Sequence, residues 1–525
     1  MNGDSLSSRG RPLFYALLFY LVIGLLLLTF YRYQLNVDGI SYISIAQKYA
    51  AGDIRNAING YWGPLISWLL VPFLLVGVNP LIATKLLSLC VGFLTIIGFW
   101  RLCFQFEMTN NIRRAVLFAL VPIVMMFALW SFTPDLLLTC ILLYYFSIIF
   151  RADYADRASK GALCGAIGAM AYLAKSYAFG FFLVHFVSFS ALHYLSADTR
   201  RKKYTVLRGF LLGSVLFCLL VAPWAYVISR KYEKLTIGMA GRYSWQVVGP
   251  ESQGQAVLWL GLLEPPNETA ISAWEDPSYI NMVPWSPFAS WNSFLYELRL
   301  IARNLYSIVV VCESFSVFFA AILLGYILIC VMPPKRLLFR RDALYPPLTI
   351  LLYGAGYIVF LIETRYLWVI YVLLLPMGGH LLYRLFKNDF FNPTRRTVAL
   401  SLFLLSFVAV PVAQLVRDMN VGKDVYDMSR KVQKIGDLDG RFASDSDWRK
   451  SVYLAYHLNV PYYGIPRPGT SQIDFQNELK KNDIDYLLVW NDEKAPLRFL
   501  STYEEVTGGK VPGLRIYHLG KPGAT

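Results

Sequence analysis

Long apolar stretches, separated by short charged connections, run along most of the chain. A helix needs about 20 apolar residues to cross the hydrocarbon layer of a membrane, and such stretches recur from Leu13 to Val416. Residues 417–525 are more polar. The pattern predicts a polytopic α-helical membrane protein with about eleven transmembrane helices, at about 13–33, 81–101, 114–132, 134–151, 161–176, 178–195, 206–228, 307–332, 345–362, 365–384 and 397–416.

One further apolar segment, Leu65–Val76, is too short to cross. It contains Pro72 and lies between Gly63-Pro64 and Gly77, which predicts a helix lying in the membrane interface. With this choice and a cytoplasmic N-terminus, the strongly basic short connections all fall on the cytoplasmic side, as the positive-inside rule requires. They contain Arg9/Arg11, Arg101/Arg113/Arg114, Arg151/Arg157/Lys160, Arg200/Arg201/Lys202/Lys203, Lys335/Arg336/Arg340/Arg341 and Arg384/Lys387/Arg395/Arg396.

The opposite side receives the first outer loop 34–80, the long outer loop 229–306 and the tail. Helical periodicity in the tail at Val425–Gln433, Ser451–His457 and Ile473–Lys481 precedes a strand-like segment, Tyr486–Trp490. The chain is therefore expected to divide into a membrane domain, 1–416, and a small extracytoplasmic α/β domain, 417–525.

Composition excludes several classes of protein. Hydrophobic residues make up 56% of the chain and aromatic residues 16%, too many for an ordinary soluble enzyme. The net charge of +15 is explained by the cytoplasmic loops rather than by a nucleic-acid partner. The seven cysteines lie in or beside apolar spans without paired spacing, which favours neither disulfides nor a metal site. The absence of Walker, dinucleotide and HExxH motifs argues against ATP hydrolysis, redox and zinc-protease chemistry.

Four ionisable side chains stand at the outer ends of different spans. Asp38 follows the first span, Asp135 begins one, Lys175 closes another, and Arg365 begins a further one. A charge near the hydrocarbon layer costs free energy and is retained mainly for a task. Four such groups on one face of the membrane predict a functional site.

Asp38 also has a purely structural explanation. Residues 39–51 read as an amphipathic helix with Ser41, Ser44 and Lys48 on one face. Asp38 then stands at the N-cap of that helix, where a carboxylate satisfies free backbone amides.

The other three charges have structural explanations too. Asp135 suits the first turn of a helix that begins at Pro134. Lys175 can extend its ammonium group to the membrane interface. Arg365 can form a surface ion pair with Glu363.

The same residues resemble patterns of the GT-C superfamily of membrane glycosyltransferases, in the branch of the protein O-mannosyltransferases and the bacterial lipid A aminoarabinose transferase. The resemblance covers roughly residues 13–416. The chain departs from the family pattern at Gly39, where a glutamate is frequent, and at Ser41, where an arginine is frequent. The motifs are Asp38-x-x-x-Tyr42-x-x-Ile45-Ala46, Asn59-Gly60-Tyr61-Trp62 with Pro64, Thr133-Pro134-Asp135, Tyr172-Leu173-Ala174-Lys175, and Arg365-Tyr366 followed by Pro376.

The resemblance implies an inverting transferase that moves a hexosyl or pentosyl unit from a polyprenyl-phosphate donor to a lipid, polysaccharide or protein acceptor outside the membrane. Asp38 is the implied general base, with Asp135 orienting its surroundings or the acceptor. Arg365 and Lys175 are the implied ligands of the donor phosphate. Substrate contacts are implied for Tyr42, Arg55, Tyr61, Trp62, Glu363 and Tyr366, although the aromatic belt of the interface explains Tyr61 and Trp62 as well.

No cofactor is required by this chemistry, and the lone carboxylate at the first-loop motif does not support a divalent-metal site. The loop 229–306 is expected to cover the cavity or to rest its aromatic rings on the bilayer. The implied location is the inner membrane of a bacterium, with the site facing the periplasm.

Two other functions remain open at this point. A transporter or flippase for a lipid-linked or glycan substrate also needs charges near membrane ends, but it predicts internal hydropathy repeats and paired broken helices near the midplane, which the sequence does not show. A catalytically inactive glycan-binding relative is the third possibility, and variants of Asp38 distinguish it from an enzyme.

Overall fold

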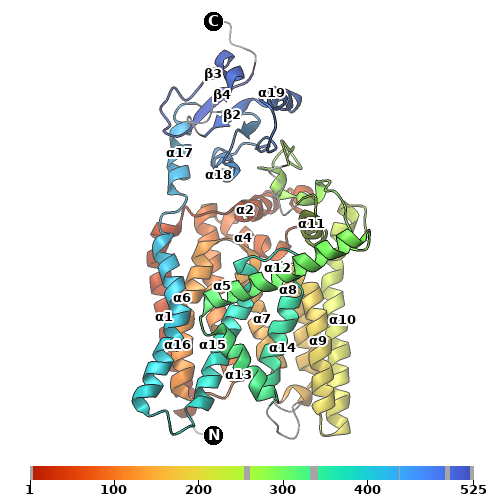
Figure 1. The fold of residues 1–525 in the computed structure, drawn as a ribbon, viewed down its shortest axis with the longest axis vertical. Helices are drawn as coiled ribbons and strands as arrows, with labels where there is room; N and C mark the ends of the chain where they lie inside the picture. The colour runs from red at the N-terminus through yellow and green to blue at the C-terminus, as the bar shows by residue number, and fades with distance from the viewer. Residues whose placement is uncertain (1–3, 253–259, 332–340, 437, 491–496, 521–525) are drawn as a thin grey trace.

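The computed structural model of the protein describes residues 4–252, 260–331, 341–436, 438–490 and 497–520. Figure 1 shows a bundle of long helices with the N-terminus at one end and a smaller α/β unit beyond the other end. The bundle helices are α1 (Asp4–Tyr31), α5 (Pro80–Cys103), α6 (Asn110–Trp130), α7 (Pro134–Ile149), α8 (Ala158–Ala174), α9 (Tyr177–Ser196), α10 (Arg200–Lys231), α12 (Trp291–Phe315), α13 (Phe319–Val331), α14 (Arg341–Ala355), α15 (Trp368–Leu385) and α16 (Pro393–Arg417).

Each predicted span overlaps one of these helices, with one exception. Within the described ranges, seven helices are long and apolar enough to cross a membrane, or eight if α12 and α13 count as one broken span. The predicted single span 307–332 is wrong in form, because α12 and α13 meet at 105°. Ser316 between them is extended, and its hydroxyl accepts from the Phe318 amide at 3.2 Å, so a new helix starts there although the apolar pattern continues.

Helices α8 and α10 are in direct backbone contact. Gly161 and Gly165 of α8 face Gly209 and Gly213 of α10, each pair spaced by three residues. A Cβ atom added at Gly165 would lie 2.0 Å from the carbonyl oxygen of Gly213. Small residues at this spacing allow membrane helices to approach closely, so this contact fixes the position of the α8 end at Ala174.

A layer of short helices covers the end of the bundle opposite the N-terminus (Figure 1). It consists of α2 (Val37–Ala50), α3 (Ile54–Ala57) and α4 (Pro64–Leu75). The 12 residues of α4 extend about 18 Å, too short to span the hydrocarbon layer. The N-cap of α2 is Asn36, so the predicted capping role of Asp38 is wrong: Asp38 lies inside the first turn. The helix is also buried on both faces rather than amphipathic, since Ile40, Ser41 and Lys48 are all buried.

The long outer loop folds over α2 with α11 (Ala240–Val247) and two short 3-10 helices, η3 (Ala273–Glu275) and η4 (Pro277–Tyr279). It also joins the tail, because the Tyr462 amide donates to the Ile271 carbonyl at 2.7 Å and Ser272 pairs with Tyr462 as an isolated parallel bridge. The loop is therefore held between the bundle and the tail.

The tail forms a small α/β unit, as predicted, and its sheet has four strands. Its order is β1-β2-β4-β3, with β1 parallel to β2 and the other neighbours antiparallel. The predicted helices and strand of the tail are all present. The elements are α17 (Lys423–Gln433), β1 (Phe442–Ser444), α18 (Trp448–Leu458), α19 (Gln472–Lys481), β2 (Tyr486–Val489), η7 (Arg498–Thr502), β3 (Glu504–Glu505) and β4 (Arg515–His518).

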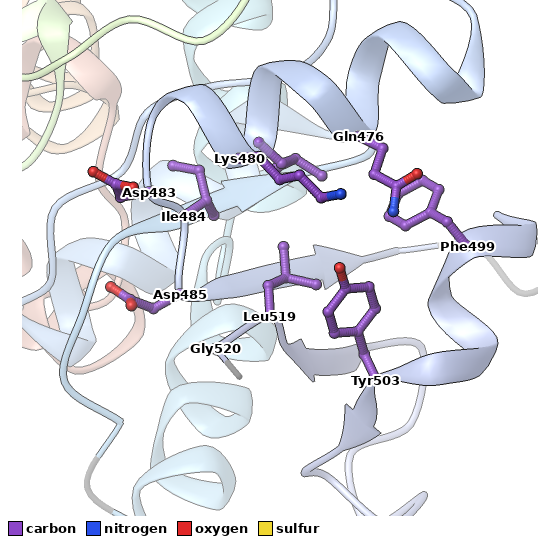
Figure 2. A pocket seen from close by; sticks show the side chains of 10 residues that line it. Gln476, Lys480, Asp483, Ile484, Asp485, Phe499, Tyr503, Leu519 and Gly520 are labelled. Atoms are coloured by element: carbon purple, nitrogen blue, oxygen red, sulfur yellow. The ribbon is translucent and has the colours of Figure 1, made fainter. Parts of the chain in front are cut away.

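A surface cavity of about 260 Å³ lies in this unit, between α19 and the segment around Tyr503. Figure 2 shows Lys480 and Gln476 above it, Phe499 at one side, and Leu519 and Tyr503 below. None of the predicted site residues lines this cavity.

Candidate functional site

Asp38 and Arg365 form an ion pair at the covered end of the bundle. Asp38 lies in the first turn of α2, and Arg365 lies in a 3-10 helix, η6 (Thr364–Leu367), that leads into α15. Arg365 Nη2 lies 2.6 Å from Asp38 Oδ2. The two residues are 327 positions apart in the sequence, so only the fold brings them together.

Asp135 and Lys175 form a second ion pair beside the first. Helix α7 begins at Pro134, which places Asp135 in its first turn as predicted, and Lys175 is the C-cap of α8. Lys175 Nζ lies 2.7 Å from Asp135 Oδ1, and Arg365 Nε lies 3.8 Å from Asp135 Oδ2. The structure therefore joins all four predicted charges in one group.

Glu363 completes this group, which we call the Asp38 cluster: Asp38, Asp135, Lys175, Glu363 and Arg365. Arg365 Nε lies 2.7 Å from Glu363 Oε2, so the ion pair expected at the surface exists, but the Arg365 side chain is only 13% exposed. Three carboxylates thus share two cations.

Aromatic rings support the cations. Lys175 Nζ lies 3.6 Å from the ring centre of Tyr366 and 5.6 Å from that of Tyr357. Tyr366 and Tyr357 stack on each other at 5.2 Å. A cation held over an aromatic face in a partly dry site is stabilised by about 1–2 kcal/mol, so Tyr366 helps to hold Lys175 where Asp135 meets it.

Trp274 of the long outer loop is a site residue that the sequence did not single out. Its Nε1 donates to Asp38 Oδ1 at 2.9 Å. The rings of Tyr61 and Trp62 each lie 5.9 Å from the Trp274 ring in edge-to-face contact. The general signal for Trp274 was the aromatic content of the loop, but no spacing in the sequence pairs it with Asp38, 236 positions away.

Tyr42, Tyr61 and Trp62 belong to one aromatic wall beside Asp38. Tyr42 lies one turn after Asp38 on α2, and its ring contacts that of Trp62 at 5.0 Å. Burial, followed by the Asp38 carboxylate, raises the pKa of the Tyr42 phenol well above its usual value. Burial likewise raises the pKa of Tyr61. Both phenols therefore stay neutral and can donate a hydrogen bond at neutral pH.

A second buried ion pair, Lys48 with Glu275, lies at the other end of α2. The side chains are 5% and 3% exposed. Burial raises the pKa of the Glu275 carboxyl, although the adjacent Lys48 ammonium opposes the shift. Lys48 appeared in the sequence only as a polar position of α2, so its partner 227 residues away was not predicted.

Arg55 lies apart from these groups. It is exposed on α3, and in the part of the chain that the structure describes it forms no ion pair with the Asp38 cluster. The Lys231 ammonium donates to the Arg55 carbonyl at 3.3 Å. The role of Arg55 in substrate binding stays a prediction. Among the described residues no group of three or more His, Cys, Asp or Glu is arranged to hold a metal ion.

No protein-family model and no curated protein sequence matches the chain. Solved structures do match it. The structure of ArnT from Cupriavidus metallidurans bound to undecaprenyl phosphate superposes with a TM-score of 0.56 at 12% identity, over 95% of this chain and 97% of that one. The Archaeoglobus fulgidus oligosaccharyltransferase in complex with Zn and sulfate superposes with a TM-score of 0.56 at 11% identity, over 90% and 67%.

The oligosaccharyltransferase AglB from the same archaeon, in complex with an inhibitory peptide and a dolichol-phosphate, gives a TM-score of 0.52 at 10% identity, over 93% of this chain and 70% of that one. At such low identities the similarity concerns the fold. The chain shares the fold of these structures, which is the GT-C-like fold that the resemblance in the sequence implied.

Proposed function

We propose that the protein is an inverting glycosyltransferase that moves a sugar from a polyprenyl-phosphate donor to an acceptor outside the membrane. The observation that carries the proposal is the Asp38 cluster, which gathers three carboxylates and two cations at the end of the bundle and pairs Asp38 with Arg365. The structural neighbours support the donor class, since one was solved with undecaprenyl phosphate and another with dolichol-phosphate.

Arg365 and Lys175 are the proposed ligands of the donor phosphate. The guanidinium fork offers several donors in one plane and suits a phosphate group, whereas the Lys175 ammonium acts as a point charge. Both cations are now held by carboxylates. The donor phosphate is a diester that joins the lipid to the sugar, so it offers the same kind of oxygen acceptors as a carboxylate and competes for these donors; it gains charge as it becomes the monoester leaving group.

Asp38 is the proposed general base. It removes the proton of the acceptor hydroxyl while that oxygen forms a bond to the anomeric carbon. The bond between this carbon and the phosphate oxygen breaks at the same time, and the electron pair leaves with the lipid phosphate. Attack from the face opposite the leaving group inverts the anomeric centre. Arg365 and Lys175 stabilise the charge that grows on the phosphate.

The ion pair between Asp38 and Arg365 links donor binding to this step. While Arg365 is paired with Asp38, the guanidinium group lies against Oδ2 and offsets the charge of the carboxylate. When the donor phosphate takes over the guanidinium group, Asp38 Oδ2 becomes free to accept a proton. The base is therefore fully available only when a donor is present.

The remaining predicted contacts have distinct proposed roles. Tyr42, Tyr61 and Trp62 give the sugar an aromatic wall with neutral phenols for hydrogen bonds. Glu363 and Tyr366 hold the cations in place. Arg55, exposed on α3, is proposed to meet the acceptor where it enters.

The orientation follows from the basic connections. The N-terminus lies at the end of the bundle opposite helix α2, which carries Asp38 (Figure 1), and the helix order places the connections after α5, α7, α9 and α15 at that same end. By the positive-inside rule that end is cytoplasmic. The site then faces the outside, which for a bacterial inner membrane is the periplasm.

Transfer by the purified protein tests the function. Wild type, Asp38→Asn and the control Asp198→Asn are assayed with a panel of undecaprenyl- and dolichyl-phosphate sugars. Asp198 lies between α9 and α10, at the far end of the bundle. We expect wild type and the control to use one donor class, and Asp38→Asn to lose at least about 100-fold in rate while still binding the donor. Full turnover by Asp38→Asn would refute the base, and no transfer from any donor by wild type would refute the function.

Labelling tests the orientation separately. A cysteine at Leu235, which is 96% exposed in the long outer loop, is expected to react with a membrane-impermeant maleimide in intact cells. A cysteine at Glu107, exposed in the connection between α5 and α6, is expected to react only after permeabilisation. Reaction of both from the same side contradicts the proposed topology.

A further inference from the structure

The turn at residues 272–276, which we call the Trp274 turn, is fixed from three directions. The Glu275 carboxylate pairs with Lys48 near the C-terminal end of α2. The Glu275 carbonyl accepts from Asn59 Nδ2 at 2.7 Å. On the other side, Ser272 pairs with Tyr462 of the tail. A short loop segment anchored to this degree holds its middle residue in one place.

That middle residue is Trp274, which sits on Asp38. Its indole Nε1 donates to Asp38 Oδ1 at 2.9 Å. Its carbonyl accepts from Ser41 Oγ and from Trp62 Nε1, each at 3.3 Å. The carbonyl contacts fix the backbone of Trp274, and the ring contact with Asp38 fixes its indole. The turn therefore sets the direction of the indole N–H.

The Lys48–Glu275 pair is costly as a stabilising device. Removing two charges from water costs several kcal/mol, and a pair of apolar residues of similar volume is frequently as stable or more so. Glu275 Oε2 has no hydrogen-bond partner among the described residues, so the desolvation of Glu275 is only partly offset. Burial also raises the pKa of this carboxyl. Such a buried pair adds little to the free energy of unfolding, but it fixes the position of the turn that carries Glu275.

We propose that Lys48 and Glu275 are positioning residues that hold the Trp274 indole against Asp38 and so aim the catalytic carboxylate. The inference rests on the proposed function of Asp38. Trp274 occupies Oδ1 and Arg365 occupies Oδ2. Once the donor phosphate draws Arg365 away, Oδ2 alone is released, and the base points in a single direction toward the acceptor hydroxyl.

The competing role for Lys48 is direct contact with the donor phosphate. The two roles differ in what a double substitution does. If Lys48 only holds Glu275, then replacing both residues by methionine removes the charges together and leaves an apolar contact of similar volume. If Lys48 binds phosphate, the double variant lacks a ligand and cannot recover.

The test compares Lys48→Met, Glu275→Met, the double variant and the exposed control Lys234→Met in the full-length protein. Two readouts are taken: transfer kinetics with the donor that wild type uses, and hydrogen exchange of the 271–276 amides. For each single variant we expect about a tenfold loss of kcat, faster exchange and a donor KM within about twofold of wild type. The double variant is expected to recover kcat and exchange to within about threefold.

Trp274→Phe isolates the hydrogen bond, since the ring is kept and the N–H is lost. We expect its kcat to fall by about threefold to tenfold with the donor KM unchanged, because the Asp38 carboxylate loses the donor that fixes its direction. Exchange of the turn is expected to stay as in wild type.

Two results overturn the inference. One is a double variant as slow as Lys48→Met with a raised donor KM, which assigns Lys48 to the donor. The other is wild-type exchange in both single variants, which shows that the pair does not hold the turn. Because exchange needs no turnover, it decides the role of the pair even if wild type transfers no sugar, an outcome that would refute only the proposed function.

Discussion

Helix α2 carries an ionised residue near each end, Asp38 in its first turn and Lys48 in its last. Both suit the helix dipole, which favours an anion at the N-terminal end and a cation at the C-terminal end. Their partners differ. Asp38 belongs to a group in which three carboxylates share two cations, whereas Lys48 has one acidic partner, Glu275. Under the proposed function, the first group exchanges partners with the donor phosphate, whereas the second stays closed.

The difference shows how burial alone fails to identify function. The Lys48–Glu275 pair is the more deeply buried of the two, at 5% and 3% exposure, yet it is matched one to one. The Asp38 cluster is more accessible, with side chains of Asp38 and Lys175 15% and 19% exposed. Under the proposed function, a cation that several carboxylates share at a partly accessible place can pass to another anion, whereas a closed pair marks a support.

The largest expected effect is on Arg365, the shared cation. Arg365→Ala removes the partner of Asp38 and Glu363 and the proposed phosphate fork, so we expect donor-dependent kcat/KM to fall by about 100- to 1,000-fold. Arg365→Lys is expected to recover only a small part, because an ammonium group cannot serve several oxygens in one plane. Steady-state transfer kinetics measure this, with exposed Arg303→Ala on α12 as the control. If Arg365→Ala were about as active as Arg303→Ala, the Asp38 cluster would differ in no functional way from the Lys48–Glu275 pair.

The next effect separates an exchanging ion pair from a closed one. Lys175→Met leaves the buried Asp135 carboxylate with only the more distant Arg365, which destabilises the fold by about 1–3 kcal/mol and slows transfer about tenfold or more. Lys175→Met with Asp135→Asn is expected to recover the unfolding temperature but not the rate. This is the reverse of the Lys48 and Glu275 double variant. Recovery of the rate would assign Lys175 a supporting role as well.

A smaller effect concerns the helix that carries Lys175. Gly165→Ala on α8 collides with the backbone of α10, so we expect a loss of about 1–3 kcal/mol in stability and a modest loss of transfer through displacement of Lys175. Gly180→Ala on α9 meets open space and is expected to be neutral or stabilising by up to about 1 kcal/mol. Thermal unfolding in detergent compares the two. Hydrogen exchange of the Trp274 turn should stay unchanged in both variants. A change would show that the Asp38 cluster and the Lys48–Glu275 pair are coupled.

The smallest effect tests the far anchor of the Trp274 turn, through the tail. Burial lowers the pKa of His457 on α18 from 6.5 to about 4. In the unfolded chain His457 therefore takes up a proton near pH 6.5, whereas in the folded tail it stays neutral down to about pH 4. The contribution of neutral His457 to the free energy of unfolding is complete above pH 6.5. It is lost as the pH falls, by about 1 kcal/mol at pH 5.5.

Limited proteolysis of the tail during heating measures this loss, and His457→Gln should flatten the dependence between pH 7 and 5.5. An unchanged slope in that variant would assign the acid sensitivity to other groups. Because Tyr462 lies close to α18 in the chain, exchange of the Trp274 turn is expected to follow the tail, while the ion pairs of the Asp38 cluster stay formed.

Much of the architecture could be predicted because it depends on local pattern. Apolar length located the bundle helices, and the periodicity of the tail located α17, α18 and α19. The side of the membrane shared by Asp38, Asp135, Lys175 and Arg365 followed from counting crossings, and the structure joins these four residues.

The rest depends on contacts that no local pattern records. The bend between α12 and α13 occurs inside a continuous apolar run, and Ser316 marks it only through its conformation. Trp274 and Glu275 reach Asp38 and Lys48 across more than 200 residues, through a loop whose path no periodicity specifies. Capping by Asp38 was a reasonable local expectation, but tertiary ion pairing with Arg365 determines its position instead.

The bridge between Ser272 and Tyr462 limits how this architecture can be recombined. Two residues after the bridge, the same loop reaches Asp38, so the tail and the loop are structurally matched parts. A chimera that takes its tail from another protein of this fold would have to import residues 260–279 with it. Exchange of the tail alone should leave the helices intact and the carboxylate misdirected.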